Sequence, residues 1–143
     1  MAEQKPRDPN YERKVRDSFA RQAAMATFGA RLLRVAPGEV DIELPFRPEL
    51  TQQNGFLHAG VVTAVIDSAC GYAAYSLMAP GADVLSVEFK VNLLAPAAGE
   101  RFEARGRVLR SGRTLTVCTG DLLAFRGGEE VHVAMMVATM IAR

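Results

Sequence analysis

The chain has 143 residues, 49% of them hydrophobic and 23% charged, which is the size and balance of one globular domain rather than of a disordered or fibrous chain. Its formal net charge is +1, so the chain lacks the excess of basic residues expected of a protein that binds nucleic acid or an anionic membrane surface. Aromatic residues make up 7% and tryptophan is absent, which argues against a surface on which bases stack.

The N-terminal region predicts a tail followed by a short helix. Residues 1–10 are polar, and we assign residues 11–143 to a single domain. From residue 9 to about residue 24, apolar side chains recur at every fourth position, the period of a helix that packs one stripe on the body: Val15, Phe19 and Ala23.

Residues 30–45 predict two strands joined at Pro37-Gly38, a dipeptide typical of turns. In the second strand apolar residues alternate with acidic ones, so that one face is buried and the other meets water. The apolar residues are Val40, Ile42 and Leu44. A loop, FRPELTQQNGFLH, then leads to the longest apolar run of the chain.

Residues 59–78 predict a long buried helix. The apolar run has about the length of a membrane span. However, Asp67 stands near its centre, where a carboxylate costs about 2.5–3.5 kcal/mol on insertion into a bilayer. A buried helix in a soluble protein is therefore the better interpretation, and we expect no membrane association.

After Pro80-Gly81 the pattern is strand and turn to the end of the chain. Alternation predicts strands near residues 85–93, 101–110, 114–125 and 130–141. The last strand is apolar on both faces, and one long helix cannot cover both faces of such a sheet. We therefore expect the N-terminal helix and a second copy of the chain to cover the remaining face, and we predict an oligomer.

The two cysteines, Cys70 and Cys118, lie in separate apolar stretches without the spacing of a metal site. They predict buried structural thiols in a reducing compartment, although the sequence alone does not exclude a disulfide. The first 22 residues are charged and lack the apolar core of a secretory signal. Together these features predict a cytoplasmic protein.

The long helix contains one acid, Asp67, and its burial in an apolar helix requires an explanation. No other charge lies between His58 and Asp83, so the helix has no ordinary solvent face on which an acid would sit. A structural hydrogen bond remains an alternative role. A carboxylate that loses hydration is, however, a better proton acceptor near neutral pH, which favours a function as general base.

His58 precedes the helix, and its distance from Asp67 restricts what the two can do together. Nine residues of helix rise ~13.5 Å and turn the two side chains about half a turn apart. One chain therefore cannot bring both to one site, and His58 alone fits a loop residue that caps the first turn. If both act in catalysis, the helix start of one subunit must meet Asp67 of another.

The start of the helix also offers hydrogen-bond donors. The first amides, those of Ala59 and Gly60, have no acceptor within a helix and can hold a developing oxyanion. Small residues before and along the helix would let a slim substrate approach, and we name four as candidate substrate contacts: Asn54, Gly55, Gly60 and Thr63.

The segment QNGFLHAGVVTAVIDSACGYAA, followed by SVEFKVNLLAPAAGERFEARGRVLRSGRTL, resembles the PaaI-type thioesterases of the 4-hydroxybenzoyl-CoA thioesterase, or hotdog, superfamily. The resemblance runs from about residue 30 to the end. It implies an α+β hotdog fold, in which a curved antiparallel sheet wraps a long central helix. Here a short N-terminal helix would be added. It also implies homodimers with two sites at their interface, often paired again into tetramers.

The resemblance further implies roles for single residues. Asp67 would be the general base or nucleophile, His58 would hold the thioester, and the amide of Ala59 would polarise its carbonyl. Gln52 would contact substrate or orient water, and Ser86 would position the water or the acid. The family pattern is His-Gly-Gly, whereas this chain has His58-Ala59-Gly60, which keeps the amide but adds a methyl group. Ser86 alternates with Glu88 and Lys90, so a solvent-facing serine is an alternative there.

A basic turn of the sequence matches a segment that lies near the nucleotide of coenzyme A in members of the resembled family. Arginine suits phosphate because its planar guanidinium can donate to two phosphate oxygens at once. The residues are Arg110, Gly112, Arg113 and Thr114.

The sequence thus favours hydrolysis of aryl-acyl or medium-chain acyl-CoA thioesters, with no metal and no cofactor except the coenzyme A of the substrate. The alternatives are a non-catalytic acyl-CoA sensor and a hydratase or dehydratase of acyl thioesters.

Overall fold

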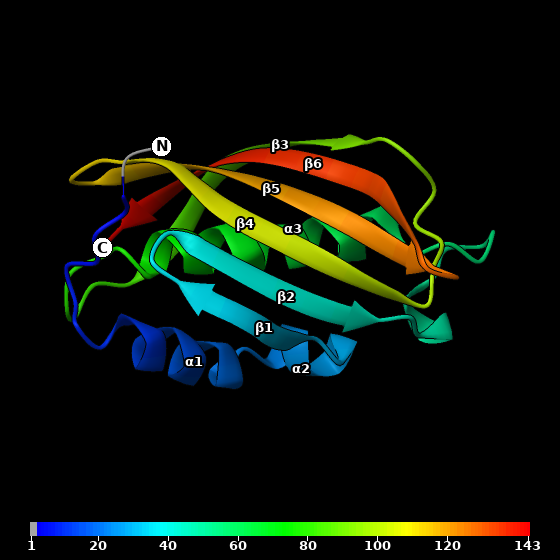
Figure 1. Ribbon diagram of the computed structural model, residues 1–143, viewed down its shortest axis with the longest axis horizontal. Helices are drawn as coiled ribbons and strands as arrows, with labels where there is room; N and C mark the ends of the chain where they lie inside the picture. Colours follow the sequence, from blue (N-terminus) through cyan, green and yellow to red (C-terminus); the bar gives the residue numbers. More distant parts are fainter. Residues whose placement is uncertain (1–2) are drawn as a thin grey trace.

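The computed structural model describes residues 3–143, and within them six strands form one antiparallel sheet in the order β1-β2-β4-β5-β6-β3. The sheet curves around the long helix α3 (Figure 1). The helices are α1 (Tyr11–Arg21), α2 (Ala23–Phe28) and α3 (Ala59–Tyr75), with a 3-10 turn at Pro48–Leu50. The strands are β1 (Arg31–Ala36), β2 (Glu39–Pro45), β3 (Val84–Leu93), β4 (Arg101–Ser111), β5 (Leu115–Arg126) and β6 (Glu129–Ala142). The predicted hotdog architecture is confirmed.

The predicted element boundaries are close to the observed ones, with one difference that matters for the site. The helix predicted over residues 9–24 is two helices, because Gln22 adopts an extended conformation with φ −80° and ψ 98° between α1 and α2. The break turns the Gln22 side chain toward α3, where it hydrogen-bonds to Ser68 and Tyr72.

Helix α3 lies directly on the sheet at a pair of glycines. Gly106 of β4 and Gly120 of β5 are cross-strand partners beneath it. A Cβ at Gly106 would lie 2.3 Å from the carbonyl carbon and oxygen of Ala69, and one at Gly120 would lie 2.4 Å from Cγ2 of Ile66. Since a side chain at Gly106 would push the helix backbone away and one at Gly120 would displace side chains of α3, these glycines set the height of α3, and thereby of Asp67, above the sheet.

The N-terminal helices do not lie where the sequence predicted them. Helix α1 contacts β1 and α3, at the sheet edge opposite β3, and therefore leaves the outer face of β6 uncovered (Figure 1). Val137 on that face is 39% exposed. Residues 3–10 form no helix or strand but contact the body, where Nη2 of Arg7 donates to the carbonyl of Gly112 at 3.2 Å.

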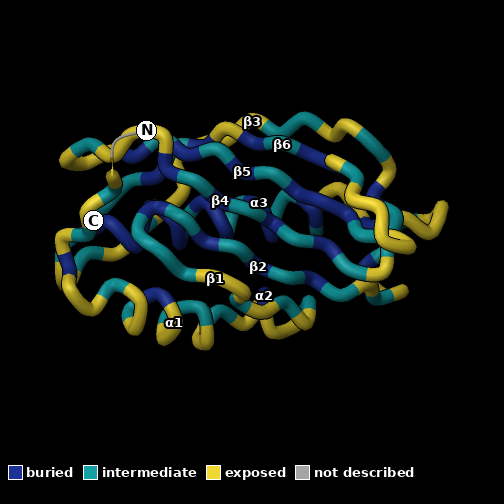
Figure 2. Tube along the Cα trace, viewed as in Figure 1, coloured by how far each residue is buried: buried dark blue, intermediate teal, exposed yellow. Residues whose placement is uncertain are grey.

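Strand β3 forms an edge of the sheet and is unusually apolar for an exposed edge. Figure 2 shows this strand as mostly exposed, in contrast to the alternating burial of β2 and β4. Val87 and Leu93 are each 54% exposed and Leu85 is 48% exposed. Exposed apolar edges of this kind are typical of surfaces that pair with another chain.

Both cysteine thiols are free and buried, and the sulfur of Cys118 lies 3.5 Å from the carbonyl oxygen of Cys70. Burial raises the pKa of Cys118 to about 12 and raises that of Cys70 well above its usual range. Only a thiolate reacts with alkylating or disulfide reagents. We therefore expect the folded protein at pH 8 to react with a disulfide reagent at less than about one hundredth of the rate in denaturant. Two equivalents of thiol titrating rapidly without denaturant would contradict this expectation.

Candidate active site

His58 is the N-cap residue of α3, and its ring is fixed by the helix start. Nδ1 of His58 accepts a hydrogen bond from the backbone N–H of Gly60 at 2.8 Å. A Cβ at position 60 would lie 3.0 Å from that same nitrogen, so glycine leaves room for the ring. Because Nδ1 is an acceptor, the proton of the neutral ring is on Nε2, which is available as a donor.

The backbone N–H of Ala59 is the free amide at this helix start. The side chain of His58 binds the N–H of Gly60, and the carbonyl of His58 accepts from Val61 and Val62. For Ala59, no acceptor lies within hydrogen-bond distance among residues 3–143. The sequence predicted two free amides here, and the structure leaves one. It is exposed and lies at the positive end of the helix dipole.

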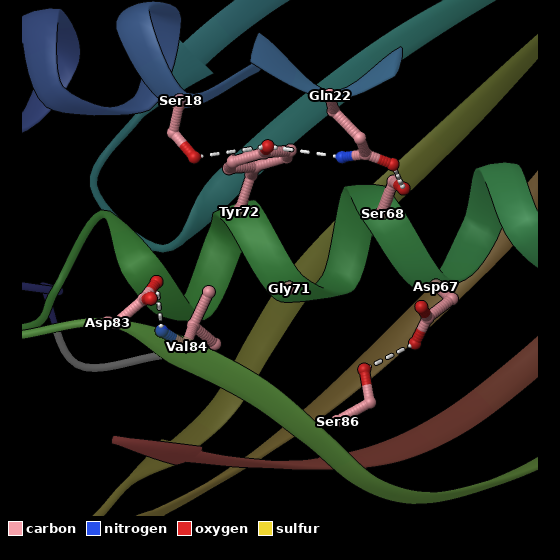
Figure 3. Close-up of a pocket in the computed structure, with 9 residues that line it drawn as sticks. All are labelled: Ser18, Gln22, Asp67, Ser68, Gly71, Tyr72, Asp83, Val84 and Ser86. Atoms are coloured by element: carbon pink, nitrogen blue, oxygen red, sulfur yellow. Dashed lines mark hydrogen bonds between the residues drawn. The ribbon is translucent and has the colours of Figure 1, made fainter. Parts of the chain in front are cut away.

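Asp67 lies two and a half turns further along α3, half-buried, and Ser86 of β3 holds its carboxylate. Oγ of Ser86 donates to Oδ1 of Asp67 at 2.7 Å (Figure 3). Neutral donors that point at a carboxylate hold it in a single orientation. Since Ser86 binds Oδ1, the other oxygen, Oδ2, remains available to accept a proton.

A β-bulge in β3 explains why Ser86 faces Asp67. The pairing of β3 with β6 shifts register between Ser86 and Glu88, with Val87 as the extra residue. Before the bulge Ser86 pairs with the buried Met140, and after it Glu88 pairs with Thr139 on the outer face. Ser86 and Glu88 therefore point to opposite faces, so the grouping of Ser86 with Glu88 and Lys90 is wrong, while Ser86 itself is exposed in the single chain.

Within one chain, the acid and the helix start line different cavities. Asp67 and Ser86 line a cavity of about 190 Å³, together with residues of α1 and α3. His58 and Ala59 line another of about 520 Å³, whose walls come from the loop before α3 and from the segment after β3. The two groups are thus separated, as the spacing of the sequence predicted.

The loop before α3 places only some of the predicted substrate contacts at a cavity. Gln52 lines the cavity of His58, and its side-chain oxygen accepts from the backbone N–H of Asn54. Asn54 and Gly55 lie exposed at the tip of this loop and line neither of the two cavities. Thr63 lies on α3 between Ala59 and Asp67, where its hydroxyl donates to the carbonyl of Ala59 at 2.8 Å.

The profile of the family described as the thioesterase superfamily matches residues 54–131. The match covers more than half of the chain and includes His58, Asp67 and Ser86. The chain belongs to the thioesterase superfamily. A crystal structure of a thioesterase family protein from Silicibacter pomeroyi is 60% identical, with a TM-score of 0.91 over 92% of this chain and 97% of the other.

Two further comparisons show how far the likeness extends. Human acyl-coenzyme A thioesterase 13 is 32% identical over 92 residues, which are 64% of this chain and 65% of that protein. The PaaI protein from the phenylacetic acid degradation operon of E. coli is 16% identical with a TM-score of 0.85, over 94% of each chain, and shares the fold. The matched region spans 61–65% of the length of the curated relatives.

The basic turn of this superfamily member is the hairpin between β4 and β5. Arg110, Arg113 and Thr114 are exposed there, and the carbonyl of Thr114 accepts from Ala142 near the C-terminus. The hairpin lies at the end of the sheet where α3 ends, away from His58 (Figure 1). Its role in binding coenzyme A stays a prediction.

Four polar side chains that line Asp67's cavity were not predicted from the sequence. Ser18 comes from α1, Gln22 from the break between α1 and α2, and Ser68 and Tyr72 from α3 (Figure 3). A glutamine in a predicted helix is an ordinary surface residue, so only the break at Gln22 could have signalled it. Among residues 3–143, no cluster of three metal-ligating side chains occurs, and no helix is long and apolar enough to span a membrane.

Proposed function

We propose that this protein hydrolyses acyl-CoA thioesters, with aryl-acyl or medium-chain acyl groups, at two equivalent sites formed between two copies of the chain. The family membership and the name of the relative acyl-coenzyme A thioesterase 13 support the reaction. No cofactor takes part except the coenzyme A of the substrate. The free, buried thiols fit the reducing conditions of the cytoplasm, where we place the protein.

The main support for a site shared between two chains is the separation of Asp67 from His58 and Ala59 within one chain. Their positions on α3 differ by a helical rise of ~13.5 Å, and they line separate cavities. A thioester carbonyl needs the amide and the base on opposite sides of one carbon atom. A second chain, related by a two-fold axis, supplies the missing half to each site, because such an interface pairs residue i with j and j with i.

The edge strand β3 provides the surface for this pairing. It carries Ser86, and it exposes the apolar side chains of Leu85 and Val87. Pairing of two β3 edges would bury these side chains and bring the two α3 helices to the same side of a continuous sheet. The uncovered outer face of β6 is then available for two dimers to pair into a tetramer.

The chemistry follows from the donors and the acceptor. The N–H of Ala59 and Nε2 of His58 donate to the thioester oxygen and stabilise negative charge as it develops there. Asp67 of the partner subunit accepts the proton of a water molecule, or its oxygen attacks the carbonyl carbon directly. In the first route the carbon–sulfur bond breaks, the thiolate of coenzyme A takes the proton that Asp67 accepted, and the acid is released. In the second route loss of the thiolate leaves an anhydride between the acyl group and Asp67, and water hydrolyses it to release the acid, restore the carboxylate and protonate the thiolate. Ser86 keeps Asp67 oriented in either route.

Mixed dimers test the shared site most directly. Ala59→Pro replaces the amide hydrogen with the proline ring, which is well tolerated at the first position of a helix. His58 already has φ −60° and ψ 138°, the extended conformation that precedes proline. Each homodimer, Ala59→Pro or Asp67→Asn, should be at least about a hundredfold less active than wild type. A heterodimer of the two, purified with two affinity tags, should regain about half of the wild-type kcat, since one of its two sites is intact.

The matched control places both substitutions on one chain and pairs that chain with a wild-type chain. Each shared site then lacks either the amide or the acid, so this heterodimer should be inactive. Sites contained within single chains would give the reverse pattern, with an inactive first heterodimer and a half-active second one. That reverse pattern would refute the shared site.

A further inference from the structure

Asn54 and Gly55 form a dipeptide that the site described above does not use. The sequence predicts contacts with substrate for both residues, whereas both lie exposed in the loop before α3 and line neither the cavity of Asp67 nor that of His58. This loop projects past the ends of the strands (Figure 1). The chemistry of the dipeptide itself gives it another role.

An asparagine followed by a glycine can lose its side-chain amide without an enzyme. The backbone nitrogen of the glycine gives up its proton and attacks Cγ of the asparagine. A bond from this nitrogen to Cγ forms, the bond from Cγ to Nδ2 breaks, and ammonia leaves, so that a five-membered succinimide ring remains. Glycine permits the attack because it has no side chain to obstruct the approach and adopts backbone conformations that other residues avoid.

Water then opens the succinimide in one of two ways. Cleavage of the new bond between nitrogen and Cγ leaves aspartate and the normal main chain. Cleavage of the bond between nitrogen and the original main-chain carbonyl leaves isoaspartate, in which the main chain runs through the former side chain and is longer by one methylene. Either product carries one new carboxylate, so the formal net charge of +1 falls to 0.

The loop gives Asn54 and Gly55 the conditions for this reaction. Gly55 has φ +85°, and a Cβ there would meet no atom of residues 3–143 within 4 Å. Its backbone N–H donates to the carbonyl of Gln52 at 3.0 Å, and this hydrogen bond must open before the nitrogen can attack. Hydrogen bonds at exposed loop tips open at little cost in free energy.

The other two asparagines of the chain lack these conditions and serve as internal controls. Asn10 precedes Tyr11 at the start of α1, and Asn92 precedes Leu93 within β3. In both cases the following residue has a bulky side chain, and its backbone belongs to a helix or a strand. Of the three asparagines, Asn54 alone combines a following glycine with an exposed loop.

The same loop supplies two walls of the cavity of His58, so a longer main chain at Asn54 changes the site. Oε1 of Gln52 accepts from the backbone N–H of Asn54 at 2.5 Å, and the N–H of Gln52 donates to the carbonyl of Phe56 at 2.8 Å. Gln52 and Phe56 both line the cavity. Because an isolated β-bridge closes the base of the loop, the extra methylene of isoaspartate must be absorbed within the loop and displaces both walls.

We propose that Asn54-Gly55 is a site of spontaneous deamidation, and that isoaspartate at position 54 lowers turnover by displacing Gln52 and Phe56 from the cavity of His58. The effect on turnover rests on the proposed thioesterase function, whereas the modification does not. The reaction consumes only water and begins with loss of a proton from the nitrogen of Gly55, so it accelerates as the pH rises. The protein thus loses activity with age, at a rate set by the pH of its surroundings.

Incubation of the wild-type protein at mildly alkaline pH tests the modification. Tandem mass spectrometry of proteolytic peptides, combined with labelling by an isoaspartate methyltransferase, identifies the converted residues. We expect Asn54 to convert first, and faster at higher pH, while Asn10 and Asn92 keep their amides. If Asn54 stays an amide for as long as it takes to convert in the same protein held in denaturant, or if Asn10 or Asn92 converts before it, the modification site is wrong.

Thiol release from phenylacetyl-CoA by the same samples tests the effect on the site. The isoaspartate form should be at least about tenfold less active, since a displacement of about 1 Å can cost about a hundredfold. Asn54→Gln should keep the activity of its own fresh sample, because the ring that a glutamine must form has six members and closes far more slowly. Asn54→Asp adds the charge without the methylene, and when fresh it should lose at most about fivefold.

Repair separates the longer main chain from other damage. Methylation of the isoaspartate carboxylate with S-adenosylmethionine re-forms the succinimide, which hydrolyses in part to aspartate, so repeated cycles should raise the activity of the aged protein to that of Asn54→Asp. Equal losses on incubation in wild type and Asn54→Gln, or an isoaspartate form as active as fresh protein, would overturn the effect on the site. Absence of hydrolysis by the fresh protein would reject the proposed function alone, because mass spectrometry detects the modification without a substrate.

Discussion

Asp67→Asn is expected to lower kcat/KM for acyl-CoA hydrolysis about a thousandfold, the middle of the range for loss of a general base. Asparagine keeps the size of the side chain, and its carbonyl oxygen still accepts from Oγ of Ser86, so the site keeps its shape. The side chain loses only its ability to take a proton or to attack. Release of the coenzyme A thiol, followed with a disulfide reagent over a panel of acyl-CoAs, measures the effect.

The control for this substitution is Asp121→Asn. Asp121 belongs to β5 and pairs with His132 on the outer face of the sheet, opposite the side that Gly120 presents to α3. Its replacement should leave kcat/KM within roughly twofold of wild type. Ser86→Ala should fall between the two, at roughly tenfold, because it removes one hydrogen bond and keeps the carboxylate. Turnover by Asp67→Asn within a factor of ten of wild type would remove Asp67 from the mechanism.

The sequence contains enough to predict the order of strands and helices and the separation of His58 from Asp67. Both follow from periodicity, since a helix has a fixed rise and a strand alternates strictly. The strand near residues 85–93 was expected at the right place, and β3 occupies Val84–Leu93. Alternation alone groups Ser86 with Glu88 and Lys90, which made a solvent-facing serine the alternative to its predicted place at the acid, and the one extra residue of the bulge separates Ser86 from that group.

The features that periodicity could not predict are those set by tertiary contact. The tautomer of His58 depends on the hydrogen bond from Gly60, which forms only when α3 begins at Ala59. The position of the Gln22 side chain at Asp67's cavity depends on the extended conformation of this residue between α1 and α2 and on its hydrogen bond to Tyr72. In both cases the residue types are ordinary, and only the packing of one element against another gives them a place in the site.

The largest effect on stability is expected at Gly106. Gly106→Ala places a Cβ 2.3 Å from backbone atoms of Ala69, and a backbone inside a helix cannot rotate away as a side chain can. Helix α3 must then lift from the sheet along its buried stripe, at a cost of about 3 kcal/mol or more. For a chain of this length we expect a fall in melting temperature of about 10 °C, measured by circular dichroism or calorimetry.

Two comparisons make the Gly106 experiment specific to the contact with α3. At Gly120 the nearest atoms belong to the side chains of Ile66 and Cys70, which can shift, so Gly120→Ala should cost less than Gly106→Ala. Gly71→Ala makes the same chemical change in α3 itself, where the added methyl meets open space, and it should stabilise the fold by up to about 1 kcal/mol. Because Asp67 is carried by the same helix, Gly106→Ala should also reduce kcat at temperatures where the protein is still folded. Equal melting temperatures for Gly106→Ala and Gly71→Ala would show that the paired glycines do not set the height of α3.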